Sequence, residues 1–381
     1  MREIKFGKPL IGNEEKNAVA KVLDGDILVH GPKAKEFENS FSQYTNALYS
    51  IAVSNCTAAL HLSHFYFGTK EGDEVIIPAM SHTATAHAVE LLGAKPIFVD
   101  AEPATGNIDI DQIESSITDR TVGISVVHFL GMPVNMEKVM AISKKHKLYV
   151  IEDCALSPGS YFKGIHTGLF GDTGCFSFYP VKHITTGEGG MIITKDEKIA
   201  SNIQRQRAFG VDRTVSERKL PGIYDVNMLG FNYRMSEIHA AIGIEQLKKL
   251  DSFIKKREEN YNLLSNSIKE INEIKLFKSA DDIFKSNYYC LQVLLNEKMT
   301  AKRFEIVTNL NKNGIQTSVY YPEAIPQFSY YREKYNYKTG MFPIAEMISK
   351  SSISLPVAPH LDLEDMEYIA SNLKQIIVGL N

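Results

Sequence analysis

The sequence contains few cysteines, and none of them are paired along the chain. Its four cysteines, Cys56, Cys154, Cys175 and Cys290, are scattered over 381 residues, and no C-x-x-C pair occurs. This spacing argues against a disulfide framework and against a structural zinc site. We interpret Cys154 and Cys175 as small core residues and not as nucleophiles.

Long apolar runs and a strong excess of charge are also missing. No apolar run reaches the roughly 18 to 20 residues of a membrane span, and Met1–Lys5 does not resemble the start of a secretory signal. The formal net charge of −3 gives no reason to expect binding to nucleic acid or to an acidic membrane surface. We therefore expect a cytoplasmic protein with no nucleic-acid partner and no membrane partner.

Metal-binding patterns are equally scarce. Among eleven histidines, His61 and His64 fall on one face of a predicted helix, and His82 and His87 lie five residues apart. No H-E-x-x-H motif or carboxylate-bearing helix accompanies them. The sequence therefore predicts no catalytic metal.

The middle of the chain alternates between two hydrophobic periods. Short β-rich runs appear at Tyr49–Ser54, Glu74–Pro78, Pro96–Asp100, Val122–Phe129 and Leu148–Asp153. Helical patterns lie between them, at Ala58–Phe67, Ala84–Leu92, Ile110–Ile117 and Met136–His146. This alternation predicts an α/β fold, a mostly parallel sheet with helices on both faces. In such sheets ligands bind beyond the carboxyl ends of the strands.

The flanking segments predict a helix before this block and a second, smaller domain after it. Gly31-Pro32 opens a helix with one apolar face. Met235 to about Ile271 reads as a long connector helix, and a strand, a helix, a strand-like run at Ile315–Tyr321 and a final helix follow. We expect a large domain over residues 1–250 and a small α+β domain over 251–381 that includes the connector.

One lysine and one aspartate point to a specific chemistry. The run Cys175–Thr194 contains two apolar stretches, and the turn between them presents Lys182. A lysine held between buried strands loses solvation and becomes a neutral amine, which imine formation requires. Asp153 ends another apolar run. A lysine for the imine and a carboxylate for the pyridine nitrogen are the two groups that a pyridoxal phosphate site requires.

Several further motifs occur in a characteristic order. They are His30–Pro32, Ser54–Leu60, Pro78–Thr85, Ile151–Ala155, Phe176–Phe178, Lys182, Gly187–Gly190, Gly230–Ser236 and Ser354–Pro356. In this order and spacing the chain resembles the DegT/DnrJ/EryC1/StrS aminotransferases over nearly its whole length. These are fold type I pyridoxal phosphate enzymes that mostly aminate keto-sugars on nucleotides.

The resemblance implies a role for each matching residue. Lys182 is the imine-forming lysine and general base, and Asp153 pairs with the pyridine nitrogen. The cofactor contacts that the resemblance adds are the phosphate ligands Cys56, Thr57 and Ser177, the ring-stacking His82, and Asn232 from a neighbouring subunit. A helix N-terminus at Cys56-Thr57 suits a phosphate for dipole reasons as well. The resemblance thus implies a homodimer with shared active sites.

Simpler interpretations of the same residues stay open. Ser54–Leu60 could be a plain helix cap, His82 a loop histidine bonded to the backbone, and Asn232 a turn residue. The chain also departs from the family pattern at three places. Cys56 stands where a glycine is frequent, Leu156 replaces a Gln or Glu that bonds the cofactor's ring hydroxyl, and Tyr320–Ala324 replaces Tyr-x-Pro-Leu-His.

The resemblance implies a two-stage transamination. An amino donor, L-glutamate, converts pyridoxal phosphate to pyridoxamine phosphate, and a keto-sugar acceptor, nucleotide-linked and used in cell-surface polysaccharide synthesis, takes the amine. The altered Tyr320–Ala324 segment keeps a smaller acceptor open, such as a phosphorylated triose or cyclitol. A dehydratase relative, in which a histidine replaces the lysine, is a third hypothesis because His183 follows Lys182. A non-catalytic cofactor-binding regulator is the alternative from a different class.

Overall fold

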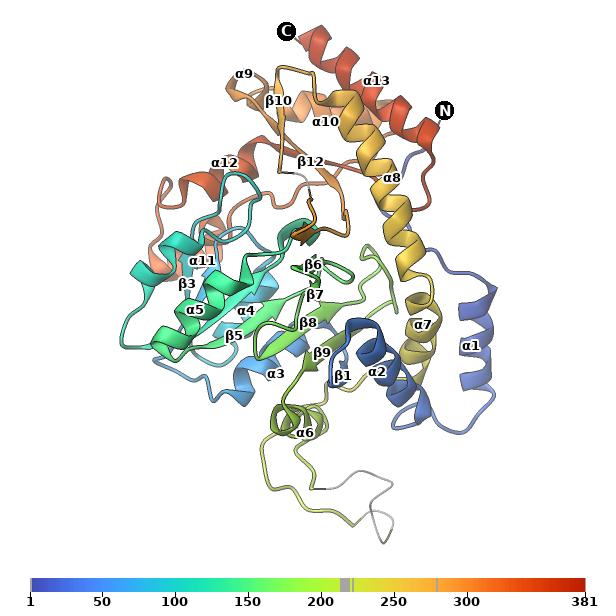
Figure 1. The fold of residues 1–381 in the computed structure, drawn as a ribbon, viewed down its shortest axis with the longest axis vertical. Coiled ribbons are helices and arrows are strands. Elements are labelled where there is room, and N and C mark those ends of the chain that lie inside the picture. Colours follow the sequence, from blue (N-terminus) through green and yellow to red (C-terminus); the bar gives the residue numbers. More distant parts are fainter. Residues whose placement is uncertain (1, 213–219, 221–222, 279, 381) are drawn as a thin grey trace.

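The computed structural model describes residues 2–212, 220, 223–278 and 280–380. Its main sheet has seven strands in the order β1-β9-β8-β5-β4-β2-β3 (Figure 1). Their bounds are β1 (Tyr49–Val53), β2 (Glu74–Pro78), β3 (Lys95–Val99), β4 (Thr121–Val127), β5 (Tyr149–Asp153), β8 (Thr173–Ser177) and β9 (Gly190–Thr194). Strand β9 is antiparallel to both of its neighbours, and the remaining pairs are parallel. The predicted mostly parallel sheet is confirmed.

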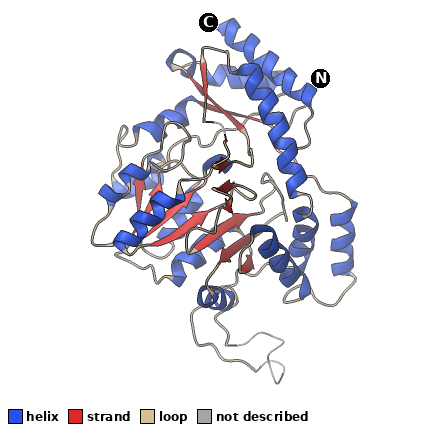
Figure 2. Cartoon of the chain, viewed as in Figure 1, coloured by secondary structure: helices blue, strands red, loops and turns tan. Residues whose placement is uncertain are grey.

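Helices cover both faces of this sheet (Figure 2). They are α2 (Pro32–Thr45), α3 (Cys56–Tyr66), α4 (Thr83–Glu90), α5 (Met136–His146), α6 (Glu197–Gln206) and α7 (Glu237–Leu247), and α1 (Asn13–Leu23) packs on α7. Successive strand residues point to opposite faces. Phe176 and Met191 accordingly pack in the core under α2 and α7, whereas Cys175 and Ile192 pack with α3 and α6. The strands are buried on both sides, which explains their nearly continuous apolar sequences.

The C-terminal region forms a second core. A three-stranded sheet has the order β10 (Ile274–Leu276), β12 (Leu291–Leu295), β13 (Ser352–Leu355). Helix α8 (Leu250–Ile268) runs from the main sheet toward this sheet and packs against α13 (Leu363–Leu380) (Figure 1). The remaining helices there are α9 (Glu297–Thr300), α10 (Arg303–Lys312), α11 (Ser329–Tyr335) and α12 (Pro343–Ser351). The domain division at residue 250 stays a prediction.

Two short connections join distant parts of the chain. Ile4, near the N-terminus, is fully buried in the C-terminal core and forms a parallel bridge with Ile315. A small sheet of β6 (Tyr161–Phe162), β7 (Ile165–His166) and β11 (Phe284–Lys285) combines residues from both sides of α8. The first residues of the chain therefore contribute to the C-terminal core.

The predicted connector, Met235 to about Ile271, is helical but is not a single helix. The chain forms α7 and α8 as separate helices with an interruption at Lys248-Lys249. No glycine or proline marks this point, so the sequence carries no local signal for it. The Lys249 ammonium is instead held by Glu15 of α1 at 2.6 Å, a contact between residues far apart in the sequence.

Two other predicted elements differ from the structure. Ile110–Ile117 forms two 3₁₀ turns, at Ile110–Gln112 and Glu114–Ser116. The hydroxyl groups of Ser115 and Ser116 both bond the Gln112 carbonyl, and such local bonds compete with regular helix. Ile315–Tyr321 forms two isolated bridges and no strand. Among the described residues, no helix is long and apolar enough to cross a membrane.

Candidate active site

Side chains from several strand ends meet at one edge of the main sheet. Cys56-Thr57 follows β1, His82 follows β2, Asp153 ends β5 and Ser177 ends β8. Carboxyl ends of parallel strands lie at the same edge, so these residues converge on one place. They line a cavity of about 540 Å³ together with Lys182. Six of the seven predicted site residues are thus brought together.

The loop that carries Lys182 is closed by its own hydrogen bonds. It joins β8 to β9, and the Phe178 N–H donates to the Gly189 carbonyl at 3.0 Å. The Thr185 hydroxyl and the Thr186 N–H both donate to the Phe178 carbonyl, at 2.9 and 3.0 Å. These bonds shape the loop without further strands. Lys182 therefore lies in a loop that its own hydrogen bonds hold in place between two buried strands.

The N-terminus of α3 faces the cavity with unpaired backbone donors. Asn55 is the N-cap, and its side chain accepts a bond from the Ala58 N–H at 2.8 Å. The first N–H groups of a helix have no intrahelical partner, and with the helix dipole they favour an anion. The capping interpretation and the anion interpretation are thus compatible. Gly190 makes this arrangement possible, because a Cβ at this position would lie 2.5 Å from the Asn55 carbonyl carbon.

The Asp153 carboxylate is buried but accepts hydrogen bonds from two neighbouring groups. Asp153 is 4% exposed, and its Oδ2 accepts a bond from the Thr85 hydroxyl at 2.8 Å while Oδ1 accepts one from the Ala155 N–H at 3.1 Å. Burial raises the pKa of Asp153 above its ordinary value, and these bonds and the nearby Lys182 offset part of that rise. The site therefore presents a carboxylate that holds a cation strongly.

Lys182 has the properties of a chemically active amine. Burial lowers the pKa of Lys182, and the nearby Asp153 carboxylate opposes this change. Burial also raises the pKa of the Cys56 thiol well above its usual value. Cys56 is thus a neutral thiol at physiological pH, and Lys182 is more readily deprotonated than an exposed lysine.

Of three further residues that the sequence analysis considered, His82 lines the cavity, whereas Asn232 and His183 do not. His82 caps α4, since its Nδ1 accepts a bond from the Ala84 N–H at 3.1 Å, and it also lines the cavity. Asn232 is exposed, pairs with Ala208 in an isolated bridge and does not line the cavity of its own chain. His183 is buried, and its Nε2 lies 3.3 Å from the Asn287 carbonyl, also outside the cavity.

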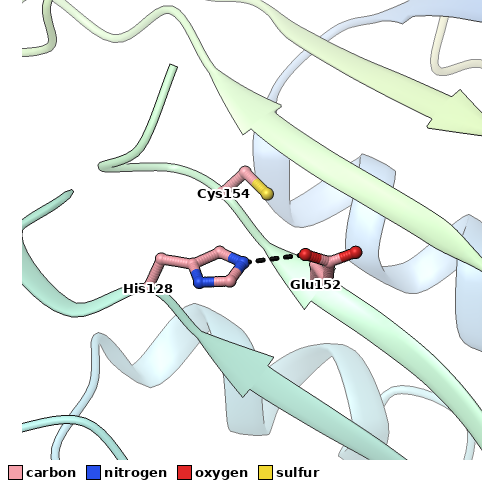
Figure 3. A group of neighbouring side chains, drawn as sticks. All are labelled: His128, Glu152 and Cys154. Atoms are coloured by element: carbon pink, nitrogen blue, oxygen red, sulfur yellow. Dashed lines mark hydrogen bonds and ion pairs between the residues drawn. The ribbon is translucent and has the colours of Figure 1, made fainter. Parts of the chain in front are cut away.

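Behind Asp153, on the opposite face of β5, lies a second polar cluster of His128, Glu152 and Cys154 (Figure 3). The Glu152 carboxylate accepts bonds from the His128 ring and from the N–H groups of Gly168, Phe170 and Gly171, all at 2.7–2.9 Å. Burial raises the pKa of Glu152, but these bonds outweigh it and hold the pKa below its ordinary value.

The same cluster is arranged as a structural anchor. The His128 Nδ1 accepts a bond from the Val134 N–H at 3.0 Å, so its proton resides on Nε2 and points at Glu152. The His128 N–H bonds the Asp153 carbonyl at 3.3 Å. Burial raises the pKa of the Cys154 thiol well above its usual value. The lone pairs that His128 and Glu152 could offer to a metal are occupied, and the cluster fixes the backbone that carries Asp153.

Thr85 and Tyr321 contribute to the site without having been predicted, and Leu156, noted above as a departure from the family pattern, lies in the cavity. Thr85 supplies the hydroxyl to Asp153, Leu156 lines the cavity with an apolar side chain, and Tyr321 reaches it from the C-terminal half. The Tyr321 ring packs edge-on against His82, with centroids 5.9 Å apart. Thr85 and Tyr321 both lie in segments that the motif comparison singled out. Neither residue could be given a role without knowing where its side chain points.

Comparison with known proteins agrees with this geometry. The model of the DegT/DnrJ/EryC1/StrS aminotransferase family matches residues 9–374. The chain belongs to this family. It is 35% identical to a GDP-perosamine synthase of Escherichia coli O157:H7 over 378 residues, which covers 98% of this chain and 99% of the relative. It is 34% identical to the spore coat polysaccharide biosynthesis protein SpsC of Bacillus subtilis, covering 99% and 97%.

Solved structures give the same result. A putative sugar aminotransferase from Streptococcus pneumoniae, in its PMP form, superposes with a TM-score of 0.94 at 26% identity and covers the whole of both chains. The protein is therefore an aminotransferase of fold type I, and its cofactor is pyridoxal phosphate. The cavity residues fit this group: a buried carboxylate, an amine of lowered pKa and a helix N-terminus open to a phosphate lie around one space.

Proposed function

We propose that this aminotransferase moves an amino group from L-glutamate to the keto group of a nucleotide-linked sugar used in cell-surface polysaccharide synthesis. The observation that carries the proposal is the cavity that joins Lys182, Asp153 and the N-terminus of α3. The full-length similarity to a perosamine synthase and a spore coat polysaccharide protein supports a sugar acceptor. Bound pyridoxal phosphate supplies a ring that accepts electrons from the carbon losing its proton.

Each residue of the chain has a defined task in this proposal. The Lys182 Nζ anchors the cofactor covalently, and when free it takes and returns a proton as general base and acid. The Asp153 carboxylate keeps the ring nitrogen protonated. The first N–H groups of α3, with the hydroxyl groups of Thr57 and Ser177, hold the phosphate. His82 covers the ring and keeps water from one side.

We further propose that the active form is a homodimer with shared sites. Among the described residues that line the cavity, Lys182 is the only lysine or arginine. An acceptor carrying a diphosphate therefore needs cations from another chain. Exposed apolar side chains lie near Asn232, with Phe209 50% and Leu229 68% exposed. Such patches mark interaction sites, and a second copy would place Asn232 at the partner's phosphate.

Two experiments test the acceptor and the site. The protein is converted to its pyridoxamine phosphate form and mixed with nucleotide-linked keto-sugars or with small phosphorylated ketones. Return of the aldehyde-form absorbance with the sugars alone is expected, and return only with the small ketones would replace the proposed acceptor. Borohydride reduction of the pyridoxal phosphate form, followed by peptide mapping, is expected to label Lys182. Labelling of a different lysine would reject its role.

The shared site is tested by mixing two inactive variants. Lys182→Ala lacks the amine, and Asn232→Ala lacks the partner's phosphate contact. In a mixed dimer one site has both residues intact, so subunit exchange should restore up to about half the activity of one wild-type dimer per mixed dimer. Exchange is verified with differently tagged chains. No recovery despite proven exchange, or a fully active monomer by sedimentation, would contradict the shared site.

A further inference from the structure

Tyr289 is a buried aromatic residue next to the catalytic centre that does not line the cavity. It lies just before β12 and is 3% exposed. The Nζ of Lys182 lies over its ring, 5.8 Å from the centroid. Ammonium groups within about 6 Å of an aromatic centroid are attracted by the negative face of the ring. The ring of Tyr289 thus brings a residue of the C-terminal half against the catalytic lysine.

A second cation uses the same ring. The guanidinium carbon of Arg257 in α8 also lies 5.8 Å from the Tyr289 centroid. Arg257 is 4% exposed, donates to the Tyr289 carbonyl at 2.7 Å and forms no ion pair with a carboxylate in the described part of the chain. Burial lowers the pKa of Arg257 to about 10, so it stays charged at neutral pH. The ring of Tyr289 therefore lies within cation–π distance of two buried cationic side chains.

The ring of Tyr289 is fixed in place. Its hydroxyl lies 2.6 Å from the Tyr320 hydroxyl, and the two rings pack edge-on with centroids 5.3 Å apart. The Tyr320 carbonyl in turn accepts a bond from the Gln292 side chain at 3.2 Å. Together with the Arg257 bond to its carbonyl, these contacts hold Tyr289 from both ends. The ring of Tyr289 therefore keeps one orientation beside Lys182.

Among the other groups around Lys182, the Asp153 carboxylate also favours the protonated amine, but it is assigned to the cofactor ring. Cys56 at α3 is a neutral thiol, His82 at α4 has a pKa lowered by burial, and Asp153 at β5 is the carboxylate assigned to the cofactor ring. His183, the next residue, has a pKa far below its ordinary value, mainly because it is buried and next because Arg257 is near. It is neutral at physiological pH.

We propose that Tyr289 is a positioning residue whose ring face holds the free amine of Lys182 and favours its protonated form. The proposal rests on Lys182 being the lysine that transfers the proton. A general base that must return its proton works best with a pKa near the working pH. Burial alone lowers the pKa of Lys182, and the ring of Tyr289 counteracts this shift. The Lys182 amine then stays protonated over the ring until it transfers its proton back.

The test separates the electrostatic effect of the ring from its packing. Full-length protein in the pyridoxamine phosphate form, in which Lys182 is free, is labelled with acetic anhydride at a series of pH values. Mass spectrometry then gives the pKa of the Lys182 amine. Tyr289→Phe is the matched control, because it keeps the ring and removes only the hydroxyl. Trifluorinated and pentafluorinated phenylalanine at position 289 keep the shape and weaken the negative face stepwise.

We expect Tyr289→Phe to leave the pKa of Lys182 near the wild-type value. Fluorination should lower it progressively, by about 0.4 to 1.5 pH units at the end of the series, the span expected for a cation on an aromatic face. The pH profile of the donor half-reaction should shift in the same direction with KM unchanged. A constant pKa across the series would overturn the proposal. Failure of borohydride to label Lys182 would instead reject the proposed function.

Discussion

Replacing Asp153 by asparagine removes a buried negative charge while it preserves the local hydrogen bonds. The new amide oxygen can accept the bond from the Ala155 N–H that Oδ1 accepts now. The new amide group can donate to the Thr85 hydroxyl, which then donates to Ser81, 2.9 Å away. The Asp153→Asn variant should therefore fold and still bind the cofactor.

The expected loss is in the rate. An amide cannot keep the ring nitrogen protonated by charge, so the cofactor becomes a weaker electron acceptor. A hydrogen bond to a charged group contributes about 1.5–3 kcal/mol. If the transition state loses this amount, the half-reaction with glutamate slows roughly 10- to 150-fold. The cofactor affinity should change far less, because the phosphate contacts are untouched.

The assay is a single-turnover reaction with glutamate, followed by the absorbance of the cofactor. Asp100→Asn is the matched control. Asp100 is also 4% exposed and follows the parallel strand β3, but its carboxylate bonds the N–H groups of Ala101, Ile344 and Ala345 outside the cavity. That variant should lose stability but little rate per folded molecule. A near-normal rate in Asp153→Asn would remove Asp153 from the proposed site.

Four further substitutions have distinct expected outcomes. A Cβ at Gly190 would lie 2.5 Å from the backbone of the N-cap residue of α3, so Gly190→Ala should destabilise the fold by about 1–3 kcal/mol in urea unfolding; an unchanged midpoint would contradict this. Thr57→Val and Ser177→Ala should each weaken cofactor binding roughly 10- to 150-fold by equilibrium titration, and unchanged affinity in both would exclude their hydroxyl groups from the phosphate site. The folded pKa of Lys182 is lowered, so the cofactor-free protein loses stability as the pH falls from the usual lysine value through the lowered one. Lys182→Met should therefore stabilise that form at pH 7 and less so near pH 10, and a stabilisation independent of pH would refute the shift.

The sequence by itself determined the elements whose signals are local. The apolar runs that became β1, β2, β4 and β5 are visible as strands because parallel sheets bury both faces of a strand. Lys182 and Asp153 were found for a related reason. Each lies directly beside such a run, and the carboxyl ends of parallel strands meet at one edge. Family motifs then added Thr57, which lies in the first turn of α3.

The tertiary structure decided everything that depends on distant contacts. At the break between α7 and α8, Lys249 forms an ion pair with Glu15. No residue near the break predicts this interruption from the sequence. The role of Thr85 depends on its side chain reaching Asp153 from another element.

Tyr289 is the clearest case. Its sequence context is only a strand entrance, yet folding brings both Lys182 and Arg257 to its ring. The hydrophobic period of a segment records which of its faces is buried, but it contains no information about which distant residue lies against that face.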